Sequence, residues 1–116
     1  MGQHANSFED FINVIFNHKK VEISPETEKI VNDSYHFLKE FSKNKVIYGV
    51  NTGFGPMAQY RIEDKDQLAL QYNIIRSHSS GMGAYFSPEI VKSAILCRLH
   101  TLSLGKSGVH PSLIHL

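Results

Sequence analysis

The sequence is poor in cysteine and in net charge, and each shortage excludes a class of protein. Cys97 is the single cysteine, so no disulfide framework can form within the chain, which fits a reducing compartment. The net charge is only +1 and the charged residues are interspersed, so nothing favours binding to nucleic acid or to a membrane surface. Cys97 lies in the apolar run AILCRL and is expected to be a small buried side chain.

Long apolar runs and a leader peptide are also missing. The longest apolar runs are far shorter than a membrane span, and the first residues, MGQHANSFEDF, lack the charged and apolar regions of a signal peptide. We therefore expect a cytoplasmic chain with no membrane partner. The last residues, GVHPSLIHL, begin a helix-like pattern after Pro111 and then stop, which indicates a piece of a longer protein.

A metal-binding pattern is absent as well, although the chain has seven histidines. No pair has the H-x-x-x-H spacing. The only close pair, His110 and His115, lacks cysteine or acidic partners at ligand spacing. We therefore expect no metal site, and we interpret His100 as a structural residue of a helix.

What is present is a globular composition with four predicted helices. The 116 residues are 41% hydrophobic and 20% charged, which is typical of one folded domain. The four helices have recognisable start signals: Ser7 with Asp10 in a capping-box pattern, Ser24-Pro25, the acidic stretch EDKDQ, and Ser87-Pro88. The third helix should end near His78, and the fourth at Gly105 and Gly108.

Apolar spacing predicts which side of each helix is buried. In the first helix the side consists of Phe8, Phe11, Ile12, Ile15 and Phe16. In the second it consists of Ile30, Ser34, Phe37, Leu38 and Phe41, in the third it includes Leu68, Tyr72 and Ile75, and in the fourth it consists of Val91, Ala94, Ile95, Leu99 and Leu102. Residues 19–24 and 45–50 are predicted as short strands. The expected fold is mainly α with a small β-ribbon.

A glycine-rich loop, YGVNTGFGPMAQ, occupies residues 48–59. Its glycines and Pro56 fit a structural turn. The glycines also match the G-x-G-x-x-A pattern of dinucleotide sites, but Pro56 removes an amide donor and no apolar helix opens at Ala58. A third interpretation is chemistry at Tyr48, because a phenol can act as a base where a site lowers its pKa or where a mobile loop excludes water.

A second glycine cluster, IIRSHSSGMG, places Ser77 and His78 at the predicted end of the third helix. A histidine at a helix end beside small residues is well placed to face a ligand. For an isolated histidine, a surface or capping role remains the alternative. Two polar clusters bracketed by glycines in one small chain favour a shared site.

Three blocks of sequence, in order and with matching spacing, resemble the N-terminal part of the aromatic amino acid ammonia-lyases. The blocks are YGVNTGFG, LQYNIIRSHSSGMG and RLHTLSLGKSGVHP, and the best fit is the histidine and tyrosine branch. The match as a whole covers nearly all of residues 45–116, whereas residues 1–44 match only as predicted helices. The resemblance implies the helical fumarase/aspartase-like fold and elimination of ammonia, as from L-histidine to give urocanate.

The resemblance also implies roles for four residues. Tyr48 occupies the position of the base that removes the β-proton of the substrate. Gly55 occupies the position of the glycine beside the substrate, within a lid that we expect to be mobile over residues 52–63. Ser77 and His78 occupy the positions that contact the substrate side chain, and a Ser-His pair is typical of histidine lyases.

The family uses an electrophilic prosthetic group, 4-methylidene-imidazol-5-one (MIO), which forms from an Ala-Ser-Gly triplet. Residues 1–116 contain no such triplet. We therefore expect a single N-terminal lyase domain, truncated before that triplet and before the central helical bundle, that is inactive alone. The full-length enzyme is expected to be a homotetramer. The alternatives are a tyrosine ammonia-lyase or aminomutase within the family, and a non-catalytic binding or assembly module outside it.

Overall fold

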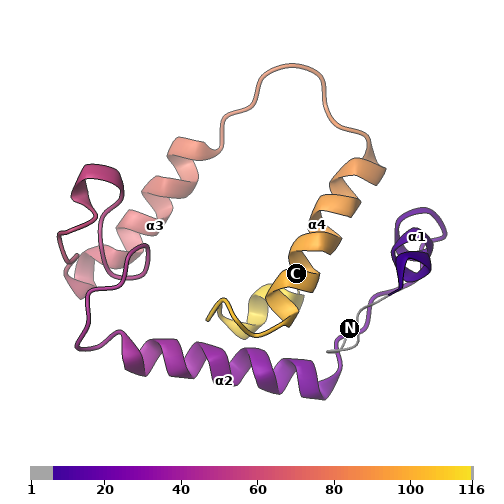
Figure 1. The fold of residues 1–116 in the computed structure, drawn as a ribbon. Coiled ribbons are helices and arrows are strands. Elements are labelled where there is room, and N and C mark those ends of the chain that lie inside the picture. Colours follow the sequence, from indigo (N-terminus) through magenta and orange to yellow (C-terminus); the bar gives the residue numbers. More distant parts are fainter. Residues whose placement is uncertain (1–6, 116) are drawn as a thin grey trace. The chain divides into compact units, whose positions relative to one another are not determined.

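The computed structural model describes residues 7–115, and its regular elements are helices (Figure 1). In chain order they are α1 (Phe8–Phe16), α2 (Pro25–Phe41), the 3-10 turn η1 (Gly55–Met57), α3 (Asp64–His78), α4 (Pro88–Ser103) and the 3-10 turn η2 (Pro111–His115). Over residues 7–115 no strand forms, and one isolated antiparallel bridge joins Thr52 to Arg61. The mainly helical fold is confirmed, and the two predicted strands are wrong.

The chain divides into two compact units. We call Glu40–Ala84 the loop unit, and the chain up to Lys39 together with the chain from Tyr85 onward the core unit. Within the core unit, α1 and η2 each pack against α4, and Figure 1 shows η2 folded back beside α4. The buried cluster of this unit consists of Val31, Leu102 and Ile114, with Ile23, Leu99 and Val109 packed against it.

The start of α1 is stabilised by the predicted capping box. The Ser7 hydroxyl accepts a hydrogen bond from the Asp10 N–H, and the Asp10 carboxylate accepts one from the Ser7 N–H, both at 3.2 Å. Lys19 Nζ donates to the same carboxylate at 2.8 Å. The Lys19 ammonium, together with the Ser7 hydroxyl, holds the pKa of Asp10 below its ordinary value, and Asp10 holds the pKa of Lys19 above its ordinary value.

The second helix begins as predicted, but part of its predicted buried side is exposed. Thr27 and Val31 are its most buried residues, each only 1% exposed. Phe37 is 65% exposed and Phe41 is 41% exposed, so the predicted burial of these two side chains is wrong.

The turn after α4 explains which side of α2 is covered. Gly105 and Gly108 have positive φ angles of 64° and 61°. A Cβ at Gly105 would collide with Ile30, and one at Gly108 would collide with Leu38. The Gly108 N–H also donates to Ser34 Oγ at 3.2 Å. The glycine turn therefore covers the side of α2 that carries Ile30, Ser34 and Leu38, as predicted for those three residues.

The buried side of α4 matches the predicted one only in part. Leu102 is buried and Leu99 packs against the buried cluster, as predicted, whereas the predicted Val91, Ala94 and Ile95 are exposed. Leu96 and Ser103 are buried without having been predicted. α1 packs against this helix and brings the Phe11 ring edge to face with His100, with centroids 6.1 Å apart. Cys97 is exposed, so its predicted burial is also wrong. On α3 the predicted apolar side is wrong as well, because Leu68, Tyr72 and Ile75 are exposed.

The two predicted strands fail for different reasons. In the first, Val21 and Ile23 are half-buried as the alternation predicts, but within residues 7–115 the segment has no neighbouring strand with which to pair. In the second, the chain turns at Gly49, whose φ of 74° is incompatible with a strand. In the first segment, the apolar alternation therefore predicted correctly which side chains are half-buried. It did not imply pairing with another strand.

Candidate functional site

Tyr48 lies in a tight turn of the loop unit. The carbonyl of Ile47 accepts hydrogen bonds from the N–H groups of Val50 at 3.1 Å and Asn51 at 3.2 Å. The Tyr48 side chain is 64% exposed and meets the ring of Phe54 edge to face, with centroids 5.8 Å apart. The phenol is therefore available to a ligand while its backbone belongs to a hydrogen-bonded turn.

The buried side chain of Asn51 fixes the residue before Tyr48. Asn51 is only 3% exposed, and its Oδ1 accepts a hydrogen bond from the Ile47 N–H at 2.8 Å. Its Nδ2 donates to the carbonyls of Ser42 at 3.0 Å and Lys45 at 2.8 Å. One amide side chain therefore ties the end of α2 and the approach to Tyr48 into a single turn.

Thr52 does the same for the residue after Tyr48. It is 1% exposed, and its Oγ1 accepts from the Gly49 N–H at 3.2 Å and donates to the Gly53 carbonyl at 2.8 Å. Sequence reasoning assigned no role to Asn51 or Thr52. The signal was present, because Asn and Thr beside turn glycines often bond the local backbone.

Residues 52–63 form a loop with its own short-range hydrogen bonds. The Gly53 N–H donates to the Tyr60 carbonyl at 3.2 Å, and a Cβ at Gly53 would lie 2.7 Å from the Cβ of Met57. Gly55 has a φ of 55° with nothing near its missing Cβ, so the backbone conformation, and not a lack of space, favours glycine there. The expected mobility of this loop stays a prediction.

Ser77 and His78 form a hydrogen-bonded pair at the end of α3. Ser77 Oγ donates to the Ile74 carbonyl at 3.0 Å, and His78 Nδ1 lies 2.9 Å from the same oxygen. The Ser77 Oγ and His78 Nδ1 atoms are 3.0 Å apart. Both side chains are exposed, so the ring edge that carries Nε2 is open to a ligand.

All four predicted site residues lie in the loop unit, in two separate pairs. Tyr48 and Gly55 flank the aromatic contact at Phe54, while Ser77 and His78 bond to each other. Within residues 7–115, no hydrogen bond or ring contact joins one pair to the other.

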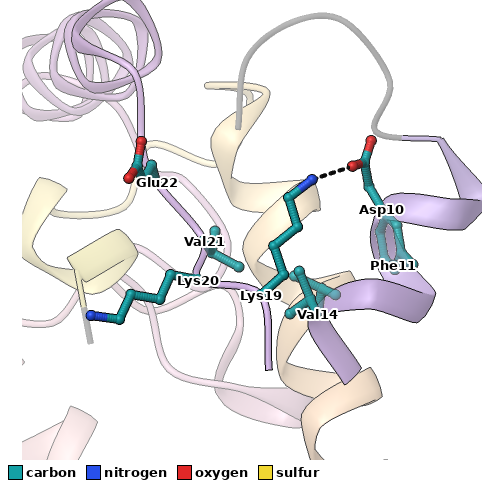
Figure 2. Close-up of a pocket in the computed structure, with 8 residues that line it drawn as sticks. Asp10, Phe11, Val14, Lys19, Lys20, Val21 and Glu22 are labelled. Carbon is teal, nitrogen blue, oxygen red and sulfur yellow. Dashed lines mark hydrogen bonds and ion pairs between the residues drawn. The ribbon is translucent and has the colours of Figure 1, made fainter. Parts of the chain in front are cut away.

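A cavity of about 490 Å³ lies instead in the core unit, between α1, the segment after it and α4 (Figure 2). Its charged rim contains the ion pair of Asp10 and Lys19, drawn as a dashed line in Figure 2. The other lining residues are Phe11, Val14, Lys20, Val21, Glu22 and Leu96. None of the four predicted site residues lines this cavity.

In the described part of the chain, no group of three or more histidine, cysteine, aspartate or glutamate side chains is placed to hold a metal ion. None of the described helices has the length and apolar character needed to cross a membrane.

Comparison with known proteins decides the relationship. The family described as aromatic amino acid lyase matches residues 7–116. The chain belongs to this family. Among the curated relatives of this chain is a probable histidine ammonia-lyase of Thermoplasma acidophilum. The two are 39% identical over 109 residues, which are 93% of this chain and 22% of that relative. The chain spans about a fifth of the length of the curated relatives it matches.

Solved structures share the fold. Phenylalanine aminomutase of Pantoea agglomerans matches with a TM-score of 0.88 and 29% identity, covering 97% of this chain and 23% of that one. Tyrosine aminomutase of Streptomyces globisporus matches with a TM-score of 0.85 and 30% identity, covering 92% of this chain and 20% of that one. The fold is therefore that of the N-terminal region of aromatic ammonia-lyase and aminomutase structures.

Proposed function

We propose that this chain is the N-terminal part of a histidine ammonia-lyase, which eliminates ammonia from L-histidine to give urocanate. The observation that carries the proposal is the exposed Tyr48 phenol on a turn fixed by two buried side chains. Curated relatives named histidine ammonia-lyase support the choice of substrate, including the human enzyme at 37% identity over 102 residues.

Tyr48 takes the role of the base in this proposal. As the phenolate, its oxygen receives the β-proton of the substrate and becomes the neutral phenol; this proton is weakly acidic and needs a positioned acceptor in a dry pocket. The hydrogen bonds that Asn51 and Thr52 accept from the Ile47 and Gly49 N–H groups hold the backbone on both sides of Tyr48, so the position of the ring depends on its own side-chain rotation. The neighbouring loop with Gly55 acts as a lid beside the substrate and limits the entry of water.

His78 faces the side chain of the substrate in this proposal, with Ser77 beside it. Nδ1 of His78 is engaged by its own helix, so Nε2 is the atom offered to the ligand. An imidazole nitrogen can hydrogen-bond the imidazole of histidine. A site group of this kind discriminates strongly against a substrate without a hydrogen-bonding partner, because the site group is then left unpaired.

The MIO group of the family supplies the electrophile that makes ammonia a leaving group. The residues of this chain do not fit its formation, because no Ala-Ser-Gly triplet occurs among them. The chain's own contribution is therefore the base, the lid and the substrate-facing histidine, and the rest of a full-length homotetramer supplies the electrophile and completes the site.

One observation favours a second candidate function. Tyrosine aminomutase of Streptomyces globisporus has the same fold at 30% identity. The phenol hydroxyl of tyrosine would meet His78 as the imidazole of histidine does. A tyrosine ammonia-lyase or aminomutase is therefore the alternative to the histidine enzyme.

An assay of the full-length protein that contains this chain tests both functions. We expect histidine to give the ultraviolet absorbance of urocanate, and tyrosine to give little coumarate or β-tyrosine. The 116-residue chain alone is the matched control and should release no ammonia from either amino acid. Turnover of tyrosine but not histidine would replace the first function with the second. Turnover of neither, or ammonia release by the chain alone, would contradict the proposal.

A further inference from the structure

The position of the proton on His78 follows from the atoms around its Nδ1. The nearest partner is the carbonyl oxygen of Ile74, at 2.9 Å. A carbonyl oxygen can only accept a hydrogen bond, so an attractive contact at this distance requires a hydrogen on Nδ1. A neutral imidazole carries one such hydrogen, which leaves Nε2 with its lone pair.

The hydroxyl of Ser77 leads to the same arrangement. Its single hydrogen is donated to the Ile74 carbonyl at 3.0 Å, so its oxygen is free to accept from His78 Nδ1 at 3.0 Å. In the opposite arrangement, Ser77 would donate to a bare Nδ1. Two lone pairs, on Nδ1 and on the Ile74 oxygen, would then face each other across 2.9 Å. Only a protonated Nδ1 makes all three contacts favourable.

We propose that His78 is held as the Nδ1–H tautomer, that Ser77 is a positioning residue which stabilises this tautomer, and that Nε2 is the acceptor presented to the substrate. The resemblance places Ser77 in direct contact with substrate, whereas its hydroxyl is engaged by Ile74 and His78. The part that concerns substrate rests on the proposed function; the tautomer itself does not.

The tautomer restricts which substrate side chains are accepted. An Nε2 lone pair needs a hydrogen-bond donor opposite it, such as the N–H of an imidazole or the O–H of a phenol. A phenyl side chain offers no donor, and a carboxylate offers only lone pairs. The substrate class is therefore an amino acid whose side chain ends in a donor.

Nitrogen-15 NMR of the 116-residue chain at alkaline pH, where imidazoles are neutral, tests the tautomer without any substrate. Loss of the signals in His78→Gln assigns them. We expect the Nδ1 shift in the protonated range and the Nε2 shift in the unprotonated range. A predominant Nε2–H tautomer would overturn the proposal.

A pair of serine variants tests the role of Ser77. Ser77→Ala removes one of the two acceptors of the Nδ1 hydrogen and should lower the Nδ1–H population of His78 measurably. Ser79→Ala is the matched control, because Ser79 Oγ bonds the Ile75 carbonyl and should not affect His78. Circular dichroism verifies that α3 is intact in both variants. An unchanged tautomer population in Ser77→Ala would show that Ser77 does not position the ring.

A separate measurement distinguishes failure of this inference from failure of the proposed function. In the full-length protein, Ser77→Ala should raise KM for histidine more than it lowers kcat, because ring orientation affects substrate binding first. If the full-length protein is no lyase, the NMR result still decides the tautomer. If it is a lyase and His78 carries its proton on Nε2, the inference alone is wrong.

Discussion

At the scale of single residues, the exposed tyrosine depends on buried polar neighbours. Asn51 makes three side-chain hydrogen bonds to backbone groups, and Thr52 makes two. These bonds satisfy backbone atoms that no strand pairs, which is why the segment around Tyr48 can turn instead of extending. The hydrogen-bonded part of the candidate site is thus the backbone turn that carries Tyr48.

Replacing Asn51 by alanine should destabilise the loop unit. The change leaves the N–H of Ile47 and the carbonyls of Ser42 and Lys45 without their partner, at a cost on the order of 2 kcal/mol. Urea unfolding of the 116-residue chain measures the free energy. The control is Asn44→Ala at a nearby exposed position, which should stay within about 0.5 kcal/mol of the parent. Equal changes in the free energy of unfolding for the two variants would show that the buried Asn51 amide does not stabilise the turn.

The residue scale also shows what the sequence could and could not predict about the site. The motif spacing located Tyr48, Gly55, Ser77 and His78 as candidates, and their roles remain predictions. It did not reveal that His78 Nδ1 is engaged by its own helix, because that contact depends on side-chain rotation. It also did not predict the turn at Gly49, since a β-branched run before a glycine fits a strand equally well.

At the scale of elements, helix ends are better specified by sequence than helix faces. The start of α1 was predicted correctly because the capping box is a local signal. The buried side of α4 was predicted only in part, with Leu102 right and Ile95 wrong, because burial depends on which elements pack against the helix. Hydrogen bonding at a helix end depends on residues that are close in sequence, whereas the burial of a helix face depends on elements that are distant in sequence.

The capping box predicts how the stability of α1 depends on pH. The pKa of Asp10 is lowered in the folded chain, so its contribution is present above the ordinary value of 3.8 and is lost as the pH falls through the lowered pKa. The pKa of Lys19 is raised, so its contribution is present below 10.5 and is lost as the pH rises through the raised pKa.

We expect Asp10→Asn to weaken α1 near neutral pH and to remove part of the acid-side loss of stability. Amide exchange of α1 and unfolding at several pH values measure both effects. Asp33→Asn on α2 is the control, because that exposed carboxylate makes no hydrogen bond or ion pair within the described residues. If stability falls toward acid pH equally in Asp10→Asn and in the parent, Asp10 does not make the pH-dependent contribution that we assign to it.

At the scale of the whole molecule, the chain has many apolar side chains on its surface. Those at least three-quarters exposed include Phe8, Met82, Tyr85 and Phe86. Phe8 and Phe16 are both exposed, so their predicted burial on the first helix is wrong. Together with a length about a fifth that of curated relatives, this exposure supports the proposal that the chain is part of a longer lyase whose remaining segments cover these residues.

The most direct test of the central claim is the turnover of histidine by the full-length protein with Phe substituted for Tyr48. Removing the phenol oxygen removes the proposed acceptor of the β-proton, so kcat should fall by about 10²–10⁴-fold while KM changes little. Tyr60→Phe, which removes an exposed hydroxyl from the neighbouring loop, should keep the parent kcat. Normal turnover by the Tyr48→Phe variant would contradict the assignment of Tyr48 as the base.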